Sequence, residues 1–136
     1  MFEIIANEPD GFTVKSNGKI ITSNFDCHSV SPVSVNEGIT SVRNAVKFRS
    51  EERWAHLVNV KDGRKIKTSL LNLLLIEFDW WFFNGCEALA ICVPSDDVIY
   101  VESAIKYQKN KDRIRVFSVE EPETCQQWIN SKVSSL

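Results

Sequence analysis

The chain has 136 residues, of which 43% are hydrophobic and 25% are charged, and its formal net charge is −2. This composition is typical of a globular protein with one core and argues against a disordered chain. The near-neutral charge excludes a global field that would attract nucleic acid or an anionic membrane. We therefore expect a single domain over residues 1–136 that binds no nucleic acid.

Three short runs rich in β-branched and aromatic residues open the chain: residues 2–6, 12–15 and 19–22. Asp10-Gly11 and Asn17-Gly18 separate these runs, and Asn-Gly or Asp-Gly between apolar runs is a strong hairpin signal. The pattern predicts an antiparallel meander.

Residues 24–35 are polar and include Pro32, and we predict a loop there. Beyond it, helices and strands alternate. Apolar spacing predicts helices over residues 36–48, 68–85, 95–109 and from Pro122 onward. β-Branched runs predict strands over residues 54–60, 87–93 and 114–119. The expected fold class is therefore α/β (an α+β mixed sheet), with an N-terminal meander followed by alternating helices and strands, which implies parallel pairings.

Residues 68–85, TSLLNLLLIEFDWWFFNG, are the most apolar stretch of the chain. A membrane-spanning helix needs about 20 predominantly apolar residues, and Asn72, Glu77 and Asp79 interrupt this run. We therefore expect no membrane span. The spacing instead predicts a helix whose sheet-facing side carries these residues: Leu70, Leu71, Leu74, Leu75, Phe78, Trp81 and Phe82.

The outer side of this helix is expected to carry polar residues, Glu77 among them, and four large apolar ones: Leu73, Ile76, Trp80 and Phe83. An exposed apolar patch marks an interface or a ligand groove, and Trp is favoured at interface centres. We therefore expect a partner interface there, with a two-fold homodimer as the simplest version. The competing interpretation is that another helix of the same chain covers these side chains.

The segment 61–69 places basic side chains just before a helix N-terminus. Arg64, Lys65 and Lys67 precede Thr68 and Ser69, and the free N–H groups and dipole of a helix N-terminus favour an anion. The segment also leaves the carboxyl end of a strand, where α/β proteins bind ligands. An anion- or nucleotide-binding module is therefore an alternative function. The competing interpretation is a solvated loop with Thr68 or Ser69 as the N-cap.

The cysteines Cys27, Cys86, Cys92 and Cys125 form no C-x-x-C pair. We interpret them as reduced thiols in a cytoplasmic protein. Cys27 adjoins His28, but a nucleophilic cysteine and its base need converging side chains, and adjacent side chains often diverge. We predict no catalytic residue, no metal site and no cofactor, hence a protein that is not an enzyme.

Three segments resemble the STAS-like domains, named for sulphate transporters and anti-sigma-factor antagonists: WAHLVNVKD, ALAICVPSDDVIYVESAIKYQ and RIRVFSVEEPETCQQWI. The third matches the family's closing pattern of a strand, Phe, an acidic turn and a helix that finishes Trp-Leu or Trp-Ile. The likeness covers residues 40–130 and is greatest to the stand-alone bacterial branch related to CRAL-TRIO-like lipid carriers. It implies a mixed sheet with helices packed against it and a regulatory or binding role.

In anti-sigma-factor antagonists the segment between strand and helix reads Asp-Ser-Ser-Gly or Asp-Ser-Thr-Gly, and its first hydroxyl is phosphorylated. The matching stretch here is Lys67-Thr68-Ser69-Leu70, which puts Thr68 at the phosphoacceptor position. Lys67 and Leu70 depart from the pattern and argue against a phosphoswitch. We expect a binding domain that associates with itself or with a regulatory protein. A carrier of a small apolar ligand, implied by the lipid-carrier likeness, is a further alternative.

Overall fold

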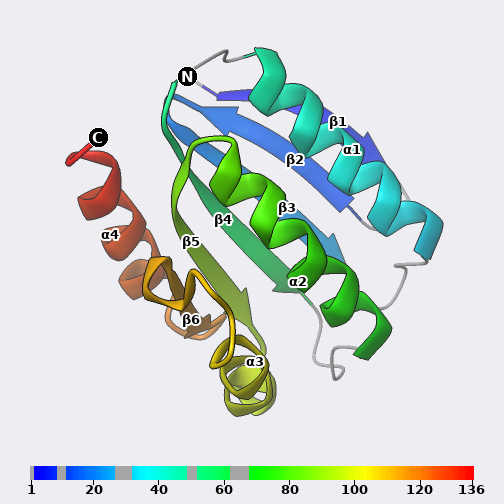
Figure 1. The fold of residues 1–136 in the computed structure, drawn as a ribbon, viewed down its shortest axis with the longest axis vertical. Helices are drawn as coiled ribbons and strands as arrows, with labels where there is room; N and C mark the ends of the chain where they lie inside the picture. The colour runs from blue at the N-terminus through cyan, green and yellow to red at the C-terminus, as the bar shows by residue number, and fades with distance from the viewer. Residues whose placement is uncertain (1, 9–11, 27–31, 49–51, 62–67) are drawn as a thin grey trace.

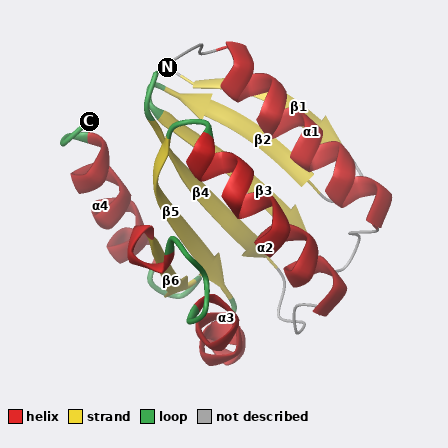
Figure 2. Cartoon of the chain, viewed as in Figure 1, coloured by secondary structure: helices red, strands yellow, loops and turns green. Residues whose placement is uncertain are grey.

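The computed structural model describes residues 2–8, 12–26, 32–48, 52–61 and 68–136, which form a six-stranded sheet and four α-helices (Figures 1 and 2). The strands are β1 Phe2–Glu8, β2 Phe12–Asn17, β3 Ile20–Asp26, β4 Trp54–Lys61, β5 Cys86–Val93 and β6 Ile114–Ser118. The helices are α1 Pro32–Phe48, α2 Thr68–Phe83, α3 Val98–Ile105 and α4 Pro122–Val133. Single 3₁₀ turns occur at Ser95–Asp97 and Lys111–Arg113.

The spatial order of the strands equals their order in the sequence, from β1 to β6. β1, β2 and β3 pair antiparallel, as predicted from Asp10-Gly11 and Asn17-Gly18 in the sequence, of which Asp10-Gly11 lies outside the described residues. β3, β4, β5 and β6 then pair parallel, with a helix in each connection. The expected mixed sheet, a meander followed by alternating helices and strands, is confirmed.

Side chains of the central strands alternate between two cores on opposite faces of the sheet. On β4, His56 and Val58 point into the larger core beneath α1 and α2, which lie over the same face in Figure 1. Ala55 and Leu57 point to the other face and pack in a smaller core with α4. A strand covered on both faces carries few polar side chains, which is why residues 54–60 and 87–93 are nearly continuous apolar runs.

The predicted bounds of several elements differ from the structure by a few residues, and two segments differ most. Residues 24–35 are not all loop, because β3 continues to Asp26 and α1 already begins at Pro32. Proline suits the first position of a helix, where its missing N–H has no acceptor to lose. The helix predicted over residues 95–109 is shorter, since α3 ends at Ile105. After Ile105 no side chain until Ile114 contributes apolar surface to the sheet, so the helix has nothing to pack with.

A tight turn at Asn84 and Gly85 joins α2 to β5. The Asn84 side chain caps α2 by donating from Nδ2 to the carbonyl oxygen of Trp80 at 2.8 Å. Trp54 binds the turn twice: its backbone N–H donates to Gly85 O and its indole Nε1 donates to Asn84 O, both at 3.0 Å. Gly85 has φ +99°, and a Cβ there would lie 3.1 Å from the carbonyl oxygen of Glu52. The position therefore requires glycine.

We expect Gly85→Ala to lower the free energy of unfolding by about 2 kcal/mol, because it adds backbone strain and a close contact. Gly18→Ala is the matched control: Gly18 also has positive φ, +59°, but nothing lies within 4 Å of its added Cβ. Its cost should be about 1 kcal/mol, that of the left-handed backbone alone. Urea unfolding measures both, and an equal or larger loss at Gly18 would contradict this account of the turn.

Candidate functional site

The solvent-facing line of α2 consists of five exposed residues: Ser69, Asn72, Ile76, Asp79 and Phe83. We call this line the outer face of α2. Its spacing of three or four residues keeps it on one side of the helix. Ile76 is 75% exposed and Phe83 is 90% exposed, so two large apolar side chains stand in water seven residues apart. The opposite side is buried as expected at Leu71, Leu74, Phe78, Trp81 and Phe82, with Leu75 half-buried; the Leu70 side chain lies outside the described residues.

The four residues expected to form an interface do not share one environment. Ile76 and Phe83 belong to the outer face, whereas Leu73 and Trp80 are half-buried and pack against the larger core. The guanidinium carbon of Arg43, on α1, lies 4.6 Å from the centre of the Trp80 ring. The same chain therefore covers part of the predicted surface, and the accessible apolar groups are Ile76 and Phe83.

Glu77 was expected on the outer side of α2, and that expectation is wrong. Its carboxylate is buried and forms a two-pronged ion pair with Arg43, which donates from Nε to Oε2 at 2.7 Å and from Nη2 to Oε1 at 2.5 Å. These hydrogen bonds raise the pKa of Arg43. A paired, hydrogen-bonded carboxylate is tolerated in a core, whereas an unpaired one is not. The pair fastens α1 to α2 and holds Arg43 over Trp80.

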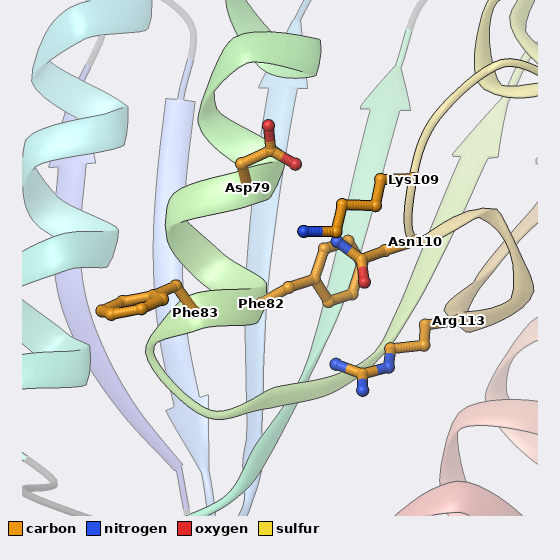
Figure 3. Close-up of a pocket in the computed structure, with 6 residues that line it drawn as sticks. All are labelled: Asp79, Phe82, Phe83, Lys109, Asn110 and Arg113. Carbon is orange, nitrogen blue, oxygen red and sulfur yellow. The ribbon is translucent and has the colours of Figure 1, made fainter.

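A surface pocket of about 340 Å³ lies at the carboxyl-terminal end of α2 (Figure 3). Six residues line it: Asp79, Phe82, Phe83, Lys109, Asn110 and Arg113. The Arg113 guanidinium carbon lies 5.9 Å from the centre of the Phe82 ring. In Figure 3 the Phe83 side chain points away from Lys109 and Arg113. The negative dipole end of α2 favours cations nearby, so Lys109 and Arg113 need no ligand to account for them.

The predicted anion-binding segment lies largely outside the described residues, since Arg64, Lys65 and Lys67 fall there. Thr68 and Ser69 are exposed in the first turn of α2. The Thr68 hydroxyl is hydrogen-bonded to the hydroxyl of Tyr100, on α3, at 2.9 Å. This bond links α2 to α3 and gives Thr68 a structural role. The anion-binding and phosphoacceptor hypotheses stay predictions.

Ser23 and His56 form a hydrogen-bonded pair that the sequence did not indicate. Ser23 Oγ lies 2.8 Å from His56 Nε2, the geometry of a serine nucleophile with its base. Both side chains are fully buried, and the His56 ring packs 4.2 Å from the Trp81 ring, centre to centre. Burial lowers the pKa of His56 from 6.5 to about 3. Because both side chains are buried and the His56 ring packs against Trp54 and Trp81, we assign the pair to the core rather than to catalysis.

Cys27 and His28 lie outside the described residues, so their pairing is untested. In the part of the chain that the structure describes, no three His, Cys, Asp or Glu side chains gather as a metal site would require. Among the same residues, no helix has both the length and the apolarity needed to cross a membrane.

Comparisons with known proteins found no relative of this chain. No protein-family model, no curated protein and no solved structure matches the chain. The resemblance to STAS-like domains therefore rests on the three sequence segments and on the order of the elements.

The burial of His56 predicts a pH-dependent stability. Because the pKa of His56 is lower in the folded protein than in the unfolded chain, the unfolded chain binds its proton first. The stabilising contribution is complete above pH 6.5 and is lost as the pH falls toward 3. We expect the free energy of unfolding to fall by about 1.4 kcal/mol per pH unit below 6.5 from this group.

Urea unfolding between neutral pH and mildly acidic pH, above the range where carboxylates titrate, measures this slope. In His56→Gln the slope should flatten, whatever the absolute stability of the variant. The chain has a second histidine, His28, and His28→Gln is the control that should keep the slope. Equal slopes in His56→Gln and the unchanged protein would contradict the assignment. An NMR titration in which the His56 imidazole protonates near pH 6.5 would contradict it independently.

Proposed function

We propose that this protein is a non-enzymatic binding domain that acts through protein–protein contact and associates with a second copy of itself through the outer face of α2. The observation that carries the proposal is the exposure of Ile76 and Phe83, 75% and 90%, on one line of a helix whose other sides are packed. Single exposed apolar residues are ordinary on protein surfaces. Two on the same exposed line, beside the half-buried Leu73 and Trp80, form a patch instead.

Burial of these side chains is energetically adequate for a weak dimer. Removing an Ile or Phe side chain from water stabilises by about 1.5–3 kcal/mol. A two-fold contact buries Ile76 and Phe83 from each copy. The four side chains then contribute roughly 6–12 kcal/mol, before the entropic cost of association is subtracted. Lost translational and rotational freedom costs about 4–15 kcal/mol. The two ranges overlap, so the contact is compatible only with a weak, reversible dimer that forms at high concentration.

The polar residues of the outer face can pair with the outer face of a second copy. In an antiparallel two-fold contact centred near Ile76, residues equally far on either side of the centre face each other. Asn72 then lies opposite Asp79 of the second copy, where its amide N–H group can donate to the carboxylate. The two Asp79 carboxylates stay roughly 10 Å apart along the helix axis, near the screening length of about 10 Å in 0.1 M salt. The contact thus places no like charges together.

A regulatory role in the cytoplasm is part of the proposal. The likeness to STAS-like domains supports regulation, because members of that family work by binding partner proteins. Cys86, Cys92 and Cys125 are present as free thiols, which is in keeping with a reducing compartment.

We expect Ile76→Glu to abolish self-association, because it places a carboxylate at the centre of the contact. Ile99→Glu is the matched control: Ile99 is on α3, is 77% exposed, and receives the same substitution away from α2. Sedimentation equilibrium over a concentration series should show the unchanged protein and Ile99→Glu approaching twice the protomer mass. Ile76→Glu should stay at the protomer mass with an unchanged urea midpoint, since its side chain is in solvent. A monomer at every concentration in the unchanged protein, or equal association of both variants, would overturn the proposal.

A further inference from the structure

The pocket at the carboxyl-terminal end of α2 lies between two segments that are distant in the sequence. Asp79, Phe82 and Phe83 of α2 form one wall, and three residues of the connection between α3 and β6 form the other (Figure 3). The cavity of about 340 Å³ is at the lower end of the range of about 300–1,000 Å³ that ligand pockets span. A ligand of this pocket is therefore a small molecule.

Backbone hydrogen bonds fix the wall that the connection supplies. Gln108 N donates to Ile105 O at 2.8 Å, and Arg113 N donates to Asn110 O at 2.9 Å, so the connection is a series of turns that leads directly into β6. Lys109, Asn110 and Arg113 are thus held beside α2 before any ligand arrives. Most small-molecule sites are formed in advance in this way.

The pocket contains charges of both signs that do not neutralise each other. Among the described residues, Asp79, Lys109 and Arg113 have no ion-pair partner and no side-chain hydrogen bond. The Arg113 guanidinium contacts the Phe82 ring at 5.9 Å, near the outer limit of about 6 Å for a cation–π contact. The dipole of α2 accounts for positive charge near its end, but not for an acid and two bases that line one cavity unpaired.

The arrangement of these charges indicates the kind of ligand. In Figure 3 Asp79 and Arg113 lie on opposite sides of Phe82. A polyanion such as a nucleotide would place several negative charges near Asp79 and the negative end of the α2 dipole. A purely apolar ligand would desolvate all three charged groups without pairing any of them. A ligand with one group of each sign pairs with both.

We propose that the pocket binds a small zwitterion, a free α-amino acid with an apolar or aromatic side chain. Its ammonium group donates to the Asp79 carboxylate, and its carboxylate accepts from Lys109 and Arg113. Its side chain lies against Phe82, which is 8% exposed and belongs to the larger core. Charge-assisted hydrogen bonds at both ends fix the orientation of the ligand.

The inference goes beyond the proposed function and does not depend on it. Asp79 also belongs to the outer face of α2, but Lys109 and Arg113 lie off this helix, and a single chain supplies the whole pocket. The test therefore uses dilute protein, at a concentration where sedimentation equilibrium gives the protomer mass. Failure of self-association would leave the test unaffected.

The test is an NMR titration of the unchanged protein with phenylalanine and with leucine. The backbone amide signals of Asn110 and Arg113 should shift to saturation with at least one of the two. N-acetylphenylalanine lacks the ammonium group and phenylalaninamide lacks the carboxylate. Each should bind about tenfold more weakly than phenylalanine, because a hydrogen bond between charged groups is lost.

Variants separate the two charged contacts. Asp79→Asn should remove the preference for phenylalanine over N-acetylphenylalanine, and Arg113→Gln should reduce the preference over phenylalaninamide. Arg115→Gln is the matched control and should change neither preference. Arg115 is also exposed, and its guanidinium carbon lies 5.2 Å from the centre of the Phe117 ring, but it does not line the pocket.

Three outcomes would overturn the proposal. The first is the absence of a saturable shift with both amino acids. The second is equal binding of the three phenylalanine compounds by the unchanged protein. The third is an equal effect of Arg113→Gln and Arg115→Gln. The substituted side chains are all exposed, and unchanged amide signals away from the pocket verify that each variant is folded.

Discussion

Side chains of β4 and β5 alternate between two separate cores, so both faces of these strands need a layer of helices. α1, α2 and α3 supply one layer and α4 supplies the other. The meander is different, because β2 buries Phe12 and Val14 on the helix side while Thr13 and Lys15 on the other side are half-buried. A single cover is enough for such a strand, as in antiparallel sheets generally. The unequal need for cover explains why α4, on the second face, packs on β4, β5 and β6, whereas α1 covers the meander on the first face.

This constraint also explains which parts of the fold the sequence could predict. Two-sided burial leaves continuous apolar runs, which revealed β4 and β5, and Gly-containing turns revealed the meander. The start of α1 was missed because Pro32 was taken as a loop signal, although the buried Val35 continues the helical spacing of Ile39 and Val42. Proline is compatible with both a loop and a helix start, and only packing with the sheet decides between them.

The sequence indicated only those parts of the candidate site that depend on spacing within one helix. Spacing along α2 correctly separated Ile76 and Phe83 from the core, because solvent exposure at a helix follows its period. It could not reveal that Arg43, 34 residues before Glu77, forms an ion pair with that carboxylate and covers Trp80. Ser23 and His56 are likewise 33 residues apart and meet only because β3 and β4 are neighbours. Contacts between elements carry no local signal in one sequence.

The strand order has a consequence for how the protein is made. Because β1 to β6 lie in sequence order, each new strand pairs with the strand synthesised just before it. The sheet can therefore grow from its N-terminal edge while the chain is still emerging from the ribosome, with no strand waiting for a distant partner. At each stage, however, the newest parallel strand is an open edge until the next strand pairs with it, and β6 stays at the edge of the described sheet. The segment that covers the far face of β4 to β6, α4, follows all six strands in the sequence, so this face gains its cover only after β6 has been made.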